Sequence, residues 1–266
     1  MCRPLRPLIL LTMALTPLGA TACGEADGLL PDAGTPDLGL GDAGLTDPGL
    51  DGGAADSGTP TTVTVRGKVE TWLSLGPPAG PIAGATVCLV QPTGPCVSSD
   101  ASGDYVLDGV PAQSEVLLEY AAVGYPTMIV PLETRAANGT LDLGLYDDPT
   151  YAAWHGQAGV PANPNRGIVL LQLAAPEVTA TLEPSSGTRT YRTFNGEVDP
   201  GLSRSEGDGW AVFFGVEPGT YRVRADHATR LCRRGRVGWP EADEETSRAV
   251  VQAGRVTRLT LACRVP

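Results

Sequence analysis

The sequence predicts an all-β protein made of two tandem antiparallel β-sandwiches that follow a disordered acidic linker. Short apolar runs alternate with polar residues at the two-residue period of strands. Glycine (34) and proline (24) exceed a fifth of the 266 residues and aromatic residues contribute only 5%, which favours turns and short strands over long helices. A glycine-bounded phrase also occurs twice, as ASGDYVLDGVPAQ (101–113) and as GDGWAVFFGVEPG (207–219).

Residues 1–22 are interpreted as a secretory signal peptide. Arg3 and Arg6 precede the apolar run LILLTMAL (8–15), which is too short to span a bilayer. Small residues then lead to Cys23 in LGATAC, which resembles the lipobox of bacterial lipoproteins. This resemblance implies lipidation at Cys23 and anchoring in the outer membrane, so the membrane is an expected partner. Because Ala20 stands where lipoproteins usually have leucine, ordinary secretion is the alternative.

Residues 23–61 are predicted to form the lipidated N-terminus and a disordered Asp/Gly-rich tether. This segment has eight acidic residues and no lysine, arginine or aromatic residue. Glycine or proline interrupts every apolar run, so the segment cannot bury enough apolar surface to offset its ordering entropy. A calcium site is the alternative, although the aspartates are too dilute for a D-x-D-x-D-G loop.

The first sandwich is predicted over residues 62–148, where no convincing helical period occurs. In TVTVRGKVE, the valines Val63, Val65 and Val69 share one face, which indicates a half-buried strand. Turn residues separate six further predicted strands, at 84–90, 95–99, 104–110, 115–122, 127–133 and 140–146.

The second sandwich is predicted over residues 149–266, and 146–167 is interpreted as the junction between the domains. In GTYRVRAD, the side chains of Tyr221, Val223 and Ala225 are expected to face a core. Strands are predicted at 167–173, 177–183, 188–194, 209–216, 219–226 and 256–264.

The repeated phrase predicts one turn geometry used twice. Gly103 and Gly209 are expected to supply φ > 0 in a turn, and the following strand ends at Gly109 or Gly215. The next valine returns to the core, and proline marks another turn. Each phrase is therefore predicted to form a hairpin with its register fixed at both ends.

The first half resembles the carboxypeptidase regulatory-like domains, whose prealbumin (transthyretin)-like β-sandwich is related to the immunoglobulin-like and starch-binding-like folds. The matching stretches are GKVE (67–70), PIAGATVCLV (81–90), SDASGDYVLDGVPA (99–112) and AAVGYPTMIVPLE (121–133). The second half matches only in GDGWAVFFGVEPGTYRVRA (207–225), so it is predicted as a second prealbumin-like domain or as a generic immunoglobulin-like sandwich. The resemblance implies an accessory module that is not an enzyme and needs no cofactor.

Beyond Cys2 and Cys23, the cysteines fall as one pair in each half. They predict the disulfides Cys88–Cys96 and Cys232–Cys263 in an oxidising compartment. The first pair flanks a predicted hairpin loop, where facing residues come within disulfide reach. Buried free thiols are the alternative, and no C-x-x-C or histidine pair indicates a metal site.

Charge divides unevenly between the two halves. Residues 62–148 hold ten acidic and three basic residues, whereas 149–266 hold twelve acidic residues and fourteen arginines. Six clustered arginines predict an anion-binding patch, namely Arg222, Arg224, Arg230, Arg233, Arg234 and Arg236. Its ligand would be acidic polysaccharide or lipopolysaccharide phosphate, because guanidinium groups bind oxyanions in a bidentate manner. An exposed face neutralised by EADEE (241–245) is the alternative, and nucleic acid is not expected for an exported chain of pI about 4.6.

No catalytic motif is present in the sequence, and packing beside Trp154 is the simplest role for His155; His227 lies far away along the chain.

The prediction is a non-enzymatic cell-envelope lipoprotein whose sandwiches make structural or adhesive contact with surface polysaccharide or another envelope protein. A carbohydrate-binding module of the starch-binding-like type is the alternative. Its sugars would stack on exposed aromatic side chains, with Trp72, Trp154, Trp210 and Trp239 as the tryptophan candidates. A small hydrolase is a third class, and it requires an acid–base pair that sequence alone does not reveal.

Overall fold

The computed structural model describes residues 61–73 and 78–265. The predicted signal peptide, Cys23 and the tether up to residue 60 lie outside these residues. Within the described part, strands predominate and a single α-helix is present, which confirms the all-β prediction. That helix is too short to cross a bilayer, and the described residues contain no other candidate span.

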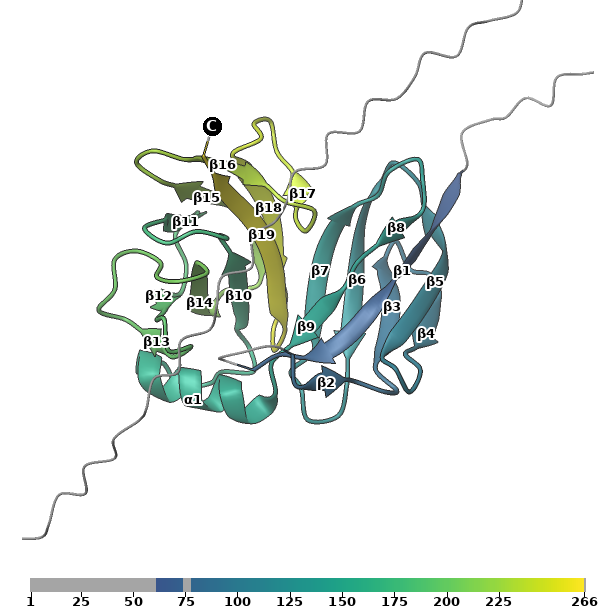
Figure 1. The fold of residues 1–266 in the computed structure, drawn as a ribbon, viewed down its shortest axis with the longest axis horizontal. Helices are drawn as coiled ribbons and strands as arrows, with labels where there is room; N and C mark the ends of the chain where they lie inside the picture. Colours follow the sequence, from purple (N-terminus) through teal and green to yellow (C-terminus); the bar gives the residue numbers. More distant parts are fainter. Residues whose placement is uncertain (1–60, 74–77, 266) are drawn as a thin grey trace, which may run out of the picture. The chain divides into compact units, whose positions relative to one another are not determined.

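The first half, residues 62–148, is a sandwich of two layers (Figure 1). Its strands are β1 (Thr62–Thr71), β2 (Gly80–Pro81), β3 (Thr86–Gln91), β4 (Cys96–Ser98), β5 (Asp104–Pro111), β6 (Glu115–Ala121), β7 (Met128–Glu133), β8 (Gly139–Thr140) and β9 (Leu143–Leu145). One layer, the first outer sheet, has the order β2–β1–β5, and β8 and β9 also pair with β1. The other layer contains β7–β6–β3–β4.

The second half, residues 149–265, adds a second outer sheet of order β11–β15–β18–β17. The elements after β9 are α1 (Asp148–Ala158), β10 (Gly167–Gln172), β11 (Thr179–Glu183), β12 (Thr188–Arg192), β13 (Val198–Asp199), β14 (Trp210–Val216), β15 (Gly219–Asp226), β16 (Leu231–Arg234), β17 (Trp239–Pro240), β18 (Thr246–Val251) and β19 (Val256–Arg264). In β15, Tyr221, Val223 and Ala225 are buried as predicted.

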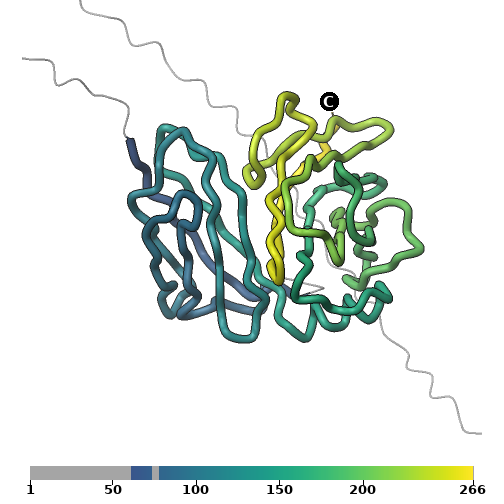
Figure 2. Tube along the Cα trace, turned by 180° about the vertical axis from the view of Figure 1, so that it is seen from behind, coloured from purple at the N-terminus to yellow at the C-terminus, as the bar shows by residue number. Residues whose placement is uncertain are grey.

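A single ten-stranded central sheet runs through both halves in the order β13–β12–β14–β10–β19–β7–β6–β3–β4, with β16 also paired to β19. The link is the parallel pairing of β19 with β7, where Val256 faces Met128 and Thr257 faces Ile129. Figures 1 and 2 show this C-terminal strand in yellow alongside the teal first half. Most strand pairs are antiparallel as predicted, and four are parallel: β1–β8, β1–β9, β10–β19 and β7–β19.

The two outer sheets cover opposite faces of the central sheet. In β10, Leu170 packs in the same core as Met128 and Val130 of β7, under the first outer sheet. Its neighbours Val169 and Leu171 point to the other side and pack against the second outer sheet. Because side chains alternate along a strand, one central sheet supplies a buried face to each sandwich.

The helix α1 was not predicted. It lies in the segment interpreted as a junction, and its Tyr151 and Trp154 pack in the first core beside Phe214 of β14. The capping signals are present in the sequence: the Asp147 side chain accepts a hydrogen bond from the backbone N–H of Thr150, and the helix ends at a left-handed glycine. The helix was missed because predicted strands flank the segment and its buried face consists of only three residues, Tyr151, Trp154 and Ala158.

The repeated phrase uses the predicted backbone conformation but does not form hairpins. Gly103, Gly109, Gly209 and Gly215 all have positive φ, between 67° and 78°. Strand β5 pairs with β1, whereas β6 pairs with β3 and β7; likewise, β14 and β15 belong to different sheets. Each phrase therefore carries the chain from one layer of a sandwich to the other. The hairpin prediction was wrong because glycine and proline positions indicate a corner without specifying the strand that pairs beyond it.

A β-bulge accompanies the second glycine of each phrase. The register of β1 with β5 shifts between Val63 and Val65, opposite Gly109, and the register of β10 with β14 shifts between Gly167 and Val169, opposite Gly215. A bulge bends the strand and re-aims the side chains that follow. The next valine is fully buried in both halves, as predicted.

The two halves share a common pairing scheme. In the first half β1 lies between antiparallel β5 and parallel β9, and in the second half β10 lies between antiparallel β14 and parallel β19. The facing layers repeat as β3–β6–β7 and β11–β15–β18. The repeated phrase thus occupies equivalent positions, while the predicted domain boundary at 148/149 stays a prediction.

Both predicted disulfides are present in the structure. Cys88 and Cys96 are directly paired residues of β3 and β4, and Cys232 and Cys263 are directly paired residues of β16 and β19. In each case, two facing residues of an antiparallel pair are cross-linked. The second bridge attaches the segment between β15 and β18 to the C-terminal strand.

Candidate functional site

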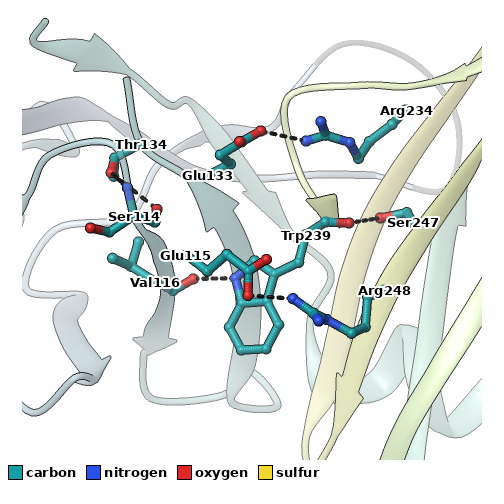
Figure 3. Close-up of polar contacts among 9 residues, drawn as sticks. All are labelled: Ser114, Glu115, Val116, Glu133, Thr134, Arg234, Trp239, Ser247 and Arg248. Atoms are coloured by element: carbon teal, nitrogen blue, oxygen red, sulfur yellow. Dashed lines mark hydrogen bonds and ion pairs between the residues drawn. The ribbon is translucent and has the colours of Figure 1, made fainter. Parts of the chain in front are cut away.

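The two halves meet across an acidic face of the first half. Glu115 and Glu119 of β6 and Glu133 of β7 alternate with the residues that enter the first core. Each of these carboxylates pairs with an arginine of the second half: Glu115 with Arg248, Glu119 with Arg255 at 2.9 Å, and Glu133 with Arg234 at 2.8 Å. Figure 3 shows the first and third of these pairs. The excess negative charge of the first half is thus partly neutralised by arginines of the second.

Trp239 of β17 anchors the second half on the first. Its side chain is buried against Leu117 and Ile129, and its indole N–H donates a hydrogen bond of 2.8 Å to the carbonyl of Val116 (Figure 3). The Arg248 guanidinium lies 5.2 Å from the centre of the indole ring. This tryptophan therefore combines apolar burial, a hydrogen bond and a cation–π contact at one point.

The structure divides the six arginines of the predicted patch. Arg222 and Arg224 lie on the outward face of β15, and Arg233 lies on β16. Ion pairs join Arg222 to Glu241 (3.7 Å), Arg224 to Asp226 (2.9 Å), Arg233 to Glu244 (3.3 Å) and Arg234 to Glu133 (2.8 Å). Arg230 follows β15 in a loop and lines none of the pockets described below. Part of the patch is therefore neutralised by carboxylates, two of them from EADEE.

A pocket lies where β7, β8 and the end of β16 come together. This junction pocket has a volume of about 350 Å³ and is lined by residues of both halves. Its polar side chains include three arginines, Arg135 of the first half and Arg234 and Arg236 of the second, with Glu133 beside them. Val63 and Val65 of β1 contribute apolar surface. Arg135 was not predicted as a site residue, because it is isolated in an acidic half and only its spatial position reveals its neighbours.

A second pocket of about 400 Å³ is lined by α1, by residues at the start of β10 and by residues of the neighbouring strands beside it. His155 lines it, and the Nδ1 atom of this histidine lies 2.8 Å from the Val160 carbonyl oxygen while its ring packs 4.7 Å from that of Phe214. His227 caps a turn, since its Nδ1 accepts hydrogen bonds from the backbone N–H groups of Thr229 and Arg230. In residues 61–73 and 78–265, neither histidine hydrogen-bonds to a carboxylate, and no acidic, histidine or cysteine cluster is arranged to hold a metal ion.

Arg258 of β19 is a buried cation with an aromatic environment. Its guanidinium lies 4.4 Å from the centre of the Trp72 ring and 5.5 Å from that of Trp210, and it donates a hydrogen bond to the Gly144 carbonyl. No carboxylate of the described part pairs with it, and burial lowers the pKa of Arg258. Because Trp72 and Gly144 belong to the first half, this residue also holds the halves together.

The tryptophans proposed for sugar stacking are largely inaccessible. Trp154 and Trp210 are 1% exposed and Trp239 is 5% exposed, while Trp72 is half-buried beside Arg258. A sugar ring stacks only on an aromatic face that solvent can reach. Three of the four tryptophans therefore serve the cores and the junction.

The comparisons with known proteins show limited likeness. No family model and no curated protein matches the sequence. Among solved structures, the chain is similar to the Bacillus anthracis TIE protein (12% identity, TM-score 0.25, 76% of this chain and 34% of that one). It is also similar to the minor pilin GBS52 of Streptococcus agalactiae (8% identity, TM-score 0.26, 78% and 97%) and to the shaft pilin spaA of Lactobacillus rhamnosus GG (10% identity, TM-score 0.26, 77% and 99%).

The chain thus spans about a third of the TIE protein and nearly the whole of each pilin. Likeness at these TM-scores supports no inference about function, and the fold class is established by the strand pairing of the chain itself. The kinship with carboxypeptidase regulatory-like domains and with lipoproteins stays a prediction from the sequence.

Proposed function

We propose that this protein is a non-enzymatic, lipid-anchored protein of the cell envelope that presents two joined β-sandwiches for adhesive or structural contact. One observation carries the proposal: the central sheet continues through both halves, so the sandwiches form one unit rather than two modules on a flexible hinge. A unit of this kind holds its outer surfaces at fixed relative positions. Such rigidity favours contact over an extended surface, because little conformational entropy is lost on binding.

Three features support this role. Two disulfides favour an exported location, because such bonds persist in oxidising compartments. The acidic tether predicted from the sequence would separate the sandwiches from the membrane. Both histidines lie within hydrogen-bond distance of backbone groups, His155 of the Val160 carbonyl and His227 of the backbone N–H groups of Thr229 and Arg230, which suits structural roles.

The anchor is tested by labelling cells with radioactive palmitate. We expect label on the wild-type protein and none on Cys23→Ala, which should appear in the medium; Cys2→Ala is the matched control, because Cys2 leaves with the signal peptide. Equal soluble release of wild type and Cys23→Ala would refute the anchor.

The contact role is tested with cells that carry the wild-type protein, cells that lack it and cells that release Cys23→Ala. We expect only the first to show increased aggregation or attachment to purified envelope polysaccharide. Equal attachment of all three would remove the adhesive role.

A further inference from the structure

We propose that the junction pocket binds the oxyanion of an acidic saccharide, that is, a carboxylate or phosphate group carried on one sugar residue. The site gives the proposed contact role a ligand but does not depend on the lipid anchor. It also replaces the six-arginine patch with a smaller site that combines one arginine of the first half with one of the second.

The charge balance of the pocket favours an anion. Glu133 is engaged by Arg234 at 2.8 Å, so this ion pair forms one neutral wall. Arg135 and Arg236 are both exposed and pair with no carboxylate of the described part. Two arginines that line one pocket attract an oxyanion, which a guanidinium group can bind through two parallel N–H donors.

A neutral donor lies in the same pocket. The side-chain oxygen of Asn138 accepts a hydrogen bond of 2.8 Å from the backbone N–H of Thr64. This contact fixes the orientation of the amide group and leaves its nitrogen without an acceptor in the described part. An oxyanion or a sugar hydroxyl would supply that acceptor.

The backbone makes room for Arg236 at the wall of the pocket. A Cβ atom on Gly139 would lie 2.7 Å from Nη2 of Arg236, so the guanidinium rests directly on the glycine backbone. Glycine at this position permits the close approach that brings Arg236 to the first half. A larger side chain would displace the guanidinium without removing its charge.

The size of the pocket and its polar lining indicate one sugar residue with an acidic group rather than a long stretch of polymer. About 350 Å³ lies at the lower end of the range of small-molecule sites. Val63, Val65 and Leu132 line the base of the pocket but are only 5%, 3% and 4% exposed, so its polar side chains supply most of the surface that a ligand can reach. A single residue of an acidic polysaccharide, or a sugar phosphate, matches this combination.

The test is isothermal titration of the full-length protein with four probes at low ionic strength: glucuronate, glucose 1-phosphate, glucose and inorganic phosphate. We expect an acidic sugar to bind and glucose to bind at least about tenfold more weakly, since charge-assisted hydrogen bonds supply the difference. The two acidic sugars distinguish a carboxylate from a phosphate ligand. Binding of neither acidic sugar, or equal binding of inorganic phosphate and the sugar phosphate, would overturn the saccharide assignment.

Variants locate the site. Arg135→Gln combined with Arg236→Gln should weaken binding of the acidic sugar at least about tenfold. Arg224→Gln is the matched control, because Arg224 is exposed, belongs to the original patch and lies outside the pocket. Gly139→Ala should also weaken binding while leaving every charge in place, which separates geometry from net charge. An equal loss in Arg224→Gln, with thermal unfolding unchanged in all variants, would show diffuse attraction and refute the site.

The two proposals fail independently. Loss of sugar binding with normal palmitate labelling and normal attachment would remove the pocket assignment and leave the display role. Normal sugar binding by a protein that carries no palmitate would refute the lipid anchor and leave the pocket assignment in place.

Discussion

At the residue scale, Gly109 and Gly209 have nearly the same φ angle in different surroundings. Their φ angles are 75° and 72°, yet a Cβ atom on Gly109 meets nothing within 4 Å, whereas one on Gly209 would lie 2.1 Å from the Ala175 carbonyl oxygen. Gly109→Ala should lower the free energy of unfolding by about 1–2 kcal/mol, the cost of a left-handed non-glycine residue. Gly209→Ala should cost more, about 3 kcal/mol or above, because backbone must also move. Urea unfolding of both variants checks the difference, and equal losses would contradict it.

The tyrosine pair in the first core carries a pH dependence. The hydroxyls of Tyr105 and Tyr120 lie 2.8 Å apart, and burial raises the pKa of Tyr105 to about 12. Between pH 10 and 12 the unfolded chain therefore releases a proton that the folded protein retains, so stability is complete below pH 10 and falls above it. Tyr105 contributes at most about 1.4 kcal/mol per pH unit to this fall. The free energy of unfolding of Tyr105→Phe should fall less steeply between pH 10 and 12 than that of the wild type. Below pH 9 the two proteins should show equal slopes in urea unfolding.

At the scale of elements, α1 depends on its first turn. The Asp147 carboxylate accepts the backbone N–H of Thr150, and Asp148 is exposed beside it. Asp147→Ala should lower the free energy of unfolding by about 1 kcal/mol. Asp147→Asn should lower it much less, because asparagine also accepts the capping hydrogen bond. Asp148→Ala is the matched control, because it removes a charge of the same turn without removing the cap. Equal effects of the two alanine variants in thermal unfolding would show that the charge, rather than the hydrogen bond, stabilises the helix.

At the scale of the whole molecule, the junction determines whether the halves unfold together. The described residues belong to one compact unit, and Trp239 of β17 packs on both β6 and β7. We expect the two halves of the wild-type protein to unfold in one calorimetric transition. Trp239→Ala should lower the free energy of unfolding by about 3–5 kcal/mol and give two resolved transitions. Phe194→Ala is the control, since Phe194 is 77% exposed and should change little. A single transition in Trp239→Ala would mean that the strand pairing of β19 with β7 is sufficient for coupling.

The sequence by itself determined the strands with clear alternation, the two cysteine pairs and the glycines with positive φ. These features depend on neighbours along the chain: the two-residue period in β15, the loop between Cys88 and Cys96, and the steric freedom of Gly103. The strand β18 was missed because its buried residues follow an acidic loop and acquire their partners from strands distant in sequence, β15 beside them and β19 in the same core.

Only the tertiary structure decided which strands pair across each glycine corner, that one sheet joins the halves, and which arginines remain available to a ligand. Arg234 pairs with Glu133 from 101 residues away, and Arg135 and Arg236, from different halves, line the same pocket. Such contacts depend on how the sheets are arranged in space. The interaction energy of a charged side chain or of a strand depends on its spatial neighbours, which the local sequence does not specify.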